Sequence, residues 1–168
     1  MSRTIGPAWK EVLNWLREAD QVQTLAIDGE SFVFEESPAD YRAFMNERAK
    51  DSNWMIQDIE GESLNRAVNF VESCLFETQA ASGCIFRPHH YVIGRKDSES
   101  LVLHLCFECG LAHAMGVIES EGYIQCENLD EATSIFGIRP NRSSQDNRIT
   151  YFPPPDSKPK QTWPIGGN

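Results

Sequence analysis

The chain has 168 residues, of which 40% are hydrophobic and 24% are charged, and its formal net charge is −10. This composition is typical of a globular protein and excludes wholesale disorder, and the length suits one domain with one hydrophobic core. A negative charge of this size repels phosphate backbones and anionic lipids, so we expect neither nucleic acid nor a membrane as the main partner.

The start of the chain predicts a helix and then a hairpin. Apolar residues spaced three and four apart after Pro7 indicate an amphipathic helix over about residues 8–19, with Trp9, Val12, Leu13 and Leu16 on one face. The β-rich runs QVQTLAI (21–27) and SFVFEE (31–36) flank Asp28-Gly29, a pair that favours a tight turn. These two runs therefore predict a β-hairpin.

The following segment predicts two more helices with a short strand or loop between them. Ser37 can cap a helix that has Pro38 in its first position and a buried stripe of Tyr41, Phe44 and Met45. Residues 54–56 (Trp-Met-Ile) favour the short strand or loop. After Gly61 the apolar spacing predicts a helix whose buried face is Leu64, Ala67, Val68, Val71 and Leu75.

The second half of the chain predicts an antiparallel meander and a final short helix. CIFRPHHYVIGR and SLVLHLCF are joined by the polar turn KDSES, and LAHAMGVIE and GYIQC alternate around a turn at residues 120–122. Asn128 and Glu131 have capping-box spacing before a helix over residues 129–136, which Gly137 ends. The expected fold class is α+β, an antiparallel sheet built from a hairpin plus a meander, with helices packed on one face.

The last 30 residues differ from the rest of the chain in composition and charge. Residues 139–168 are rich in Pro, Ser and Gly without apolar periodicity, so we expect one domain over 1–138 and an extended or mobile tail over 139–168. The tail has a net charge of +3 and the first 138 residues have a net charge of −13. This acidity would attract a basic protein surface, but acidity that only keeps a small protein in solution is the more general explanation, so charge alone identifies no partner.

The sequence also predicts the compartment and the state of its cysteines. No apolar run reaches the length of a signal sequence or a membrane span, so we expect a cytoplasmic protein. Five cysteines in a reducing compartment favour buried thiols or a metal over a lasting set of disulfides.

Cysteine and histidine are concentrated between residues 84 and 109, in a pattern that raises a zinc site as a hypothesis. CFECG is a Cys-x-x-Cys followed by Gly, the form of a turn whose amides can face two metal-bound thiolates. Cys84 with His89, or with His90 in its place, would complete the site with Cys106 and Cys109. Three thiolates and one imidazole make a closed structural zinc site.

Three other interpretations of the same residues stay open. Cys106 and Cys109 are small buried hydrophobes if the strand continues past them, because positions three apart then point to opposite faces. A redox pair is the second, although such motifs open a helix after a strand, and no helix is predicted here. The third is Cys–His catalysis, with Cys84 or Cys109 as nucleophile, His90 or His113 as base and Glu108 to orient the base.

Enzyme signatures are otherwise missing from the sequence. It contains no Gly-x-x-x-x-Gly-Lys, Gly-x-Gly-x-x-Gly, His-Glu-x-x-His or Gly-x-Ser-x-Gly motif. We therefore expect a protein that is not an enzyme and that needs no cofactor, with zinc as the one candidate ligand.

The stretch CIFRPHHYV, followed by a polar turn and LVLHLCFECG, resembles a pattern found in small bacterial proteins that look like toxin-immunity proteins. The resemblance covers about a quarter of the chain, from Cys84 to about Val117. It implies a non-catalytic protein that binds and neutralises a cognate toxin or effector, and the acidity of the chain implies that this partner has a basic surface. The alternative is a zinc-binding (Cys3His) structural or regulatory domain.

Overall fold

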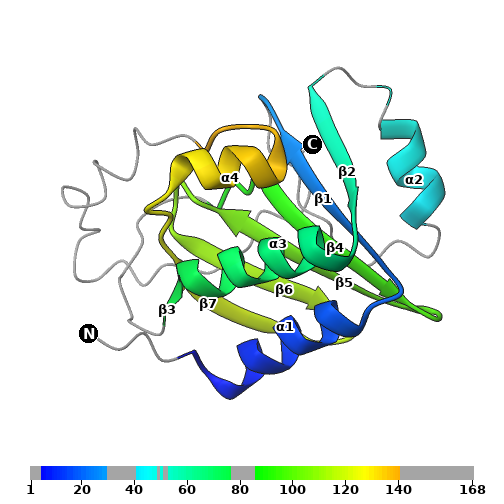
Figure 1. Cartoon of the computed structure of the whole chain (residues 1–168), viewed down its shortest axis with the longest axis horizontal. Coiled ribbons are helices and arrows are strands. Elements are labelled where there is room, and N and C mark those ends of the chain that lie inside the picture. The colour runs from blue at the N-terminus through cyan, green and yellow to red at the C-terminus, as the bar shows by residue number, and fades with distance from the viewer. Residues whose placement is uncertain (1–4, 30–40, 49, 51–52, 77–85, 141–168) are drawn as a thin grey trace, which may run out of the picture.

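The computed structural model describes residues 5–29, 41–48, 50, 53–76 and 86–140. Within them the chain forms one seven-stranded sheet, in which every pair of neighbouring strands is antiparallel, together with four helices (Figure 1). The elements in chain order are α1 (Pro7–Glu18), β1 (Gln21–Ile27), α2 (Tyr41–Arg48), β2 (Trp54–Ile59), α3 (Gly61–Cys74), β3 (Leu75–Phe76), β4 (His90–Lys96), β5 (Glu99–Cys106), β6 (Leu111–Gly116), β7 (Ser120–Ile124) and α4 (Leu129–Phe136). The structure confirms the α+β class.

The strand order is β2-β1-β4-β5-β6-β7-β3, so the four consecutive strands β4 to β7 form a meander at the centre of the sheet. Short connections favour this arrangement, since only the sequence between successive strands has to turn back. β1 lies between β2 and β4 and pairs with both along its length. β3 is a two-residue strand that pairs with β7 at the far edge.

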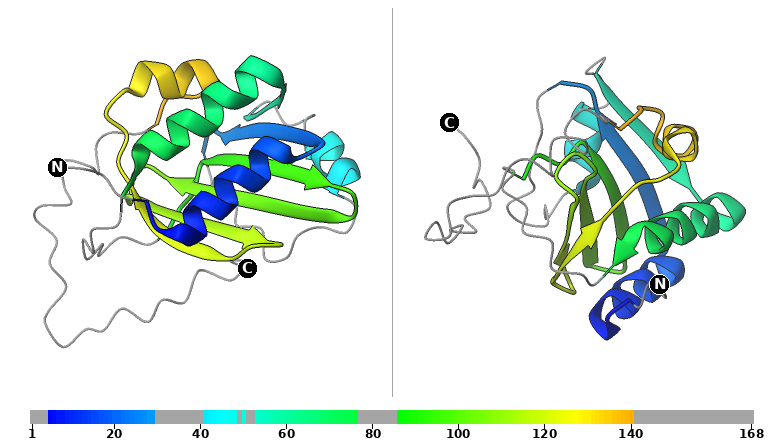
Figure 2. Two further views of the ribbon diagram at one scale, coloured as in Figure 1. Left: turned by 60° about the horizontal axis from the view of Figure 1, so that its bottom comes forward. Right: turned by 90° about the vertical axis from the view of Figure 1, so that its left-hand side faces the viewer.

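Helices α1, α3 and α4 cover one face of this sheet, which we call the helix face (Figure 2). α1 buries the four residues that the periodicity predicts, and α4 is capped by the side chain of Asn128, which accepts a hydrogen bond from Glu131 N–H at 3.0 Å. Under the helices lies the main hydrophobic core, to which the sheet contributes Val22, Ala26, Ile59, Leu75, Val92, Leu101, Leu103, Leu105, Ala112, Ala114 and Ile124. Burying this apolar surface is the main force that holds the two layers together.

Two glycines let α1 lie close to the sheet. A β-carbon on Gly94 would stand 2.7 Å from the side chain of Leu16, and one on Gly122 would stand 2.5 Å from the Trp9 indole nitrogen. That nitrogen donates a hydrogen bond to the carbonyl oxygen of Glu121 at 3.0 Å. Any larger side chain at position 122 would push Trp9 away from the strand and weaken this bond.

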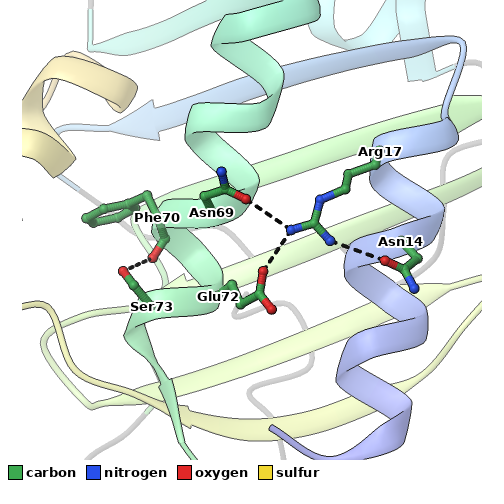
Figure 3. A network of polar contacts seen from close by, with 6 residues as sticks. All are labelled: Asn14, Arg17, Asn69, Phe70, Glu72 and Ser73. Carbon is green, nitrogen blue, oxygen red and sulfur yellow. Dashed lines mark hydrogen bonds and ion pairs between the residues drawn. The ribbon is translucent and has the colours of Figure 1, made fainter. Parts of the chain in front are cut away.

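A polar network joins α1 to α3 at the surface of the helix layer (Figure 3). The guanidinium of Arg17 donates to Asn14 at 3.2 Å on its own helix, and to Asn69 at 3.1 Å and Glu72 at 2.7 Å on α3. One side chain of α1 therefore makes polar contacts with two residues of α3.

The opposite face of the sheet, which we call the second face, carries a separate apolar cluster of Leu25, Ile27, Tyr91, Ile93 and Val102. All five side chains are buried. None of them lies under α1, α3 or α4, because in each strand they alternate with the residues of the helix face.

Most of the predicted elements are confirmed, among them the first helix, the helix after Gly61, the β4–β5 hairpin, the meander and α4. Helices α1, α3 and α4 do cover one face of the sheet, as expected, whereas Arg48 of α2 lies over the ring of Trp54, which packs with the apolar cluster of the second face. The hairpin predicted from 21–27 and 31–36 is wrong, since both edges of β1 are occupied by β2 and β4. Residues 31–36 themselves lie outside the described residues, as do residues 37–40, the predicted stripe side chains of α2 and the tail from residue 141.

Three smaller differences concern where elements begin and end. Leu75 belongs to β3 and not to the preceding helix. β4 begins at His90, so residues 86–89 precede the strand. The turn between β6 and β7 falls at residues 117–119, which places Gly122 inside β7 beneath Trp9. The predicted turn at 120–122 is wrong because a close helix contact, and not a turn, explains the glycine.

Candidate functional site

The CFECG segment forms a tight turn that brings its two cysteines together. β5 ends at Cys106, and the carbonyl oxygen of this residue accepts a hydrogen bond from Gly110 N–H at 2.7 Å. Gly110 has a φ of +70°, which a residue with a β-carbon rarely adopts. The backbone N–H of Cys109 donates to the sulfur of Cys106 at 3.2 Å. An amide that faces a sulfur in this way is typical of a turn that holds a metal ion between two cysteines.

Both thiols of this turn are buried in a small cluster apart from the main core. Cys106 and Cys109 are each 1% exposed and pack with Phe86, with half-buried Leu111 beside them. Positions three apart would point to opposite faces in a continuous strand, but β5 ends at Cys106. The side chains of Cys106 and Cys109 can therefore share a site. None of the four cysteines in the described part of the chain forms a disulfide.

The other predicted zinc ligands are placed differently. The ring of His89 is half-buried, and its Nε2 donates to the carbonyl oxygen of Gly29 at 2.9 Å. Cys84 lies outside the described residues. Across residues 5–29, 41–48, 50, 53–76 and 86–140, no three His, Cys, Asp or Glu side chains are grouped closely enough to hold a metal ion. The structure thus pairs Cys106 with Cys109, and the four-ligand site stays a prediction that depends on Cys84.

His90, the alternative ligand and candidate base, points into the helix face. Its Nε2 donates to the carbonyl oxygen of Ile138 at 2.8 Å, and its ring packs edge-on against Phe107 and Phe136 with centroids 5.2 Å away in each case. Burial lowers the pKa of this imidazole to about 4, although the hydrogen bond to Ile138 opposes the shift. His90 therefore belongs to the packing beside α4, on the same face of the sheet as Leu105 and opposite to Cys106.

A row of ionisable side chains that the sequence analysis did not assemble crosses the second face. Tyr91 on β4 pairs in register with His104 on β5, His104 with His113 on β6, and His113 with Glu121 on β7. The two imidazoles stack with ring centroids 5.9 Å apart, and the Tyr91 ring meets His104 edge-on at 5.6 Å. The Tyr91 hydroxyl donates to the carbonyl oxygen of Pro88 at 2.7 Å.

The electrostatics of this row change from its centre to its outer end. His104 is fully buried, and burial together with the neighbouring His113 lowers its pKa to about 3. Burial also lowers the pKa of half-buried His113, but there the negative charges of Glu121 and Glu119 act in the opposite direction. At neutral pH the inner imidazole is therefore uncharged, and the outer one faces two carboxylates.

The negative charge of the chain is concentrated in the part that carries this row. Between Lys96 and Arg139 there is no Lys or Arg, whereas residues 97–138 contain eight Asp and Glu. Six of these eight are exposed: Asp97, Glu99, Glu119, Glu121, Glu127 and Asp130. Strands β5 to β7 and helix α4 thus carry an excess of negative charge, although α4 lies beside β1 and β2, where Asp130 and Glu131 form ion pairs with Arg139 and Arg66.

No family model matches the chain, and no curated protein or solved structure matches it significantly. Its function has to be inferred from the residues described above. A membrane-spanning helix would need greater length and a more apolar surface than any helix has in the described part of the chain.

Proposed function

We propose that the chain is a non-catalytic immunity protein that acts in the cytoplasm and neutralises a cognate bacterial toxin or effector through an acidic surface. The observation that supports this most directly is the segment 97–138, with eight carboxylates and no Lys or Arg. An excess of one charge steers a partner of opposite charge and repels other acidic proteins. The partner is therefore a protein with a basic surface.

The sequence motif agrees with this proposal. The Cys-x-x-x-Pro-His-His and Cys-Phe-x-Cys segments resemble those of immunity-like proteins. In the described residues the first segment leads into β4, which begins at His90. The second segment forms the turn between β5 and β6. On this proposal the motif holds the sheet in shape and the carboxylates meet the toxin.

Co-expression with the product of the neighbouring gene tests the proposal. We expect the chain to restore growth to cells that produce that protein, and the two to purify as a stable complex. Because the attraction is between opposite charges, the complex should weaken roughly tenfold between about 50 and 500 mM salt. A neighbouring product that is harmless to cells, or that neither binds the chain nor is silenced by it, contradicts the proposal.

The cysteine turn favours a second candidate, a zinc-binding structural or regulatory domain. The N–H to sulfur contact at 3.2 Å and the positive φ of Gly110 give Cys106 and Cys109 the shape of half a zinc site. The remaining ligands on this hypothesis are Cys84 and His89.

Cobalt substitution separates zinc binding from plain burial of the thiols. In untagged protein a Cys3His site binds one Co²⁺ and shows thiolate-to-cobalt absorption, which Cys106→Ser or Cys109→Ser removes. Cys74→Ser and Cys126→Ser are matched controls, because these thiols are also buried and form no disulfide but lie outside the turn. Protein that binds no Co²⁺ or Zn²⁺ and folds normally in chelator excludes this candidate.

A further inference from the structure

The second face is buried at its centre and becomes accessible toward β6 and β7. On β5 its residues Val102, His104 and Cys106 are no more than 1% exposed. Their neighbours in register on β6 are Met115, His113 and Leu111, all half-buried. On and just before β7 follow half-buried Tyr123 and the exposed side chains of Glu121 and Glu119.

These six residues, Leu111, His113, Met115, Glu119, Glu121 and Tyr123, are named here the β6–β7 surface. Two properties of the β6–β7 surface point to the same kind of partner. Its centre offers apolar and aromatic side chains, and half-buried Phe76 on β3 extends it, with its ring 6.1 Å from that of Tyr123. Its rim is acidic, and neither β6 nor β7 contains a Lys or Arg.

We propose that the β6–β7 surface is the site at which the chain binds its basic protein partner. This proposal rests on the proposed function and adds the place and chemistry of the contact. Arg or Lys side chains of the partner lie against Glu119 and Glu121, and an aromatic or aliphatic anchor packs against Leu111 and Tyr123, which face each other in register. An apolar centre with a charged rim is the usual anatomy of a protein interface.

Other occupants fit this surface less well. A second copy of the chain would bring the same carboxylates against each other in a symmetric contact, and like charges repel. Nucleic acid would meet the same repulsion. On the helix face the equivalent strand positions are covered by α1, α3 and α4, so that face of the sheet offers no comparable site (Figure 2).

A defined basic probe maps the surface without knowledge of the toxin. The isotope-labelled full chain is titrated with the peptide Arg-Trp-Arg-Trp-Arg-Trp, with Glu-Trp-Glu-Trp-Glu-Trp as the control peptide. We expect amide shifts to concentrate in β6, β7 and residues 117–119, to require the basic peptide and to weaken with salt. Shifts that centre on the acidic side chains of α1 and α3, or that the acidic peptide reproduces, overturn the proposal.

Two variants and two matched controls test the surface in the complex with the toxin. Val117→Arg and Glu119→Lys change exposed residues at the rim. Met55→Arg and Glu11→Lys make the same changes at exposed positions on β2 and α1, and Met55 is 42% exposed against 41% for Val117. We expect each rim variant to weaken binding by roughly tenfold or more and each control by less than about twofold.

The outcomes distinguish the site from the function. If the neighbouring gene product binds the chain and all four variants bind it equally, the site is wrong and the immunity function stands. If that product is not a toxin but the basic peptide maps to β6–β7, the function fails and the site stands. A photocrosslinker at position 117 that joins only residues of the same chain or a second copy, in the presence of the toxin, overturns the site.

Discussion

Each face of the sheet buries a histidine, and the surroundings of the two side chains differ. On the helix face His90 lies between Phe107 and Phe136 and donates a hydrogen bond to the carbonyl oxygen of Ile138. On the second face His104 stacks on another imidazole, which in turn is paired with Glu121 on the next strand. The first arrangement is closed by packing, whereas the second continues toward an acidic, more exposed surface.

This difference indicates that one face of the sheet mainly stabilises the fold and that the other can take part in binding. The helix face collects apolar side chains from α1, α3, α4 and all seven strands and so provides most of the stability. The second face has a smaller apolar cluster and carries the row of ionisable groups. Substitutions in the core of the helix face should therefore lower the stability of the protein. Substitutions in the outer part of the second face should instead change its affinity for a partner.

The largest effect is expected from Phe136→Ala. This ring is fully buried in α4, where it contacts Phe70 at 6.3 Å, Phe107 at 6.3 Å and His90 at 5.2 Å between centroids. Its removal leaves a cavity under the helix and should lower the free energy of unfolding by about 3–5 kcal/mol. Urea unfolding at pH 8 measures this loss, with Val117→Ala on the exposed side as the control. A loss below about 1 kcal/mol would mean that α4 contributes little to the helix face.

The next largest effect is a loss of stability on acidification. The pKa of His90 falls from 6.5 to about 4 on folding, so between these pH values the unfolded chain binds more protons than the folded one. Stability therefore rises with pH across this window, and its loss on acidification to pH 4 is about 3 kcal/mol for a shift of this size. For His104 the window extends from 6.5 down to about 3.

Replacement of each histidine separates its contribution from that of the carboxylates. His90→Phe and His104→Phe should each reduce the slope of unfolding free energy against pH below 6.5, whatever they do to stability at pH 8. NMR titration of the imidazole carbons provides a direct check on the wild type. A ring at position 90 or 104 that titrates near 6.5 in the folded protein would show that it is not desolvated.

The sequence predicts the central part of this fold well and its edges poorly. The pattern of strands from His90 to Ile124 is clear because each run is β-rich and bounded by a polar or glycine-containing turn. The partners of β1 could not be predicted, since β2 and β4 are distant in sequence and nothing local encodes their pairing. The Asp28-Gly29 turn signal favoured the nearest β-rich run instead.

The candidate site shows the same limit. Sequence spacing was enough to find Cys106 and Cys109, because a turn of four residues brings them together. The row Tyr91–His104–His113–Glu121 depends on the register of three strand pairs, which a shift of one residue would move to the other face. The one signal available was that His104 and His113 alternate with apolar residues on successive strands, which places them on the face opposite Leu103 and Ala114.

The smallest effect is expected where the helix layer meets solvent. Arg17 joins α1 to α3 through Glu72 at 2.7 Å and Asn69 at 3.1 Å, and the two charged side chains are 30% and 41% exposed (Figure 3). Water and salt screen a pair this accessible, so Arg17→Ala should cost about 0.5–1 kcal/mol and lose part of that cost in high salt. Arg66→Ala, which breaks the more exposed pair with Glu131 between α3 and α4, should cost less. If Arg17→Ala instead cost as much as Phe136→Ala, the polar network, and not apolar packing, would hold the helices on the sheet.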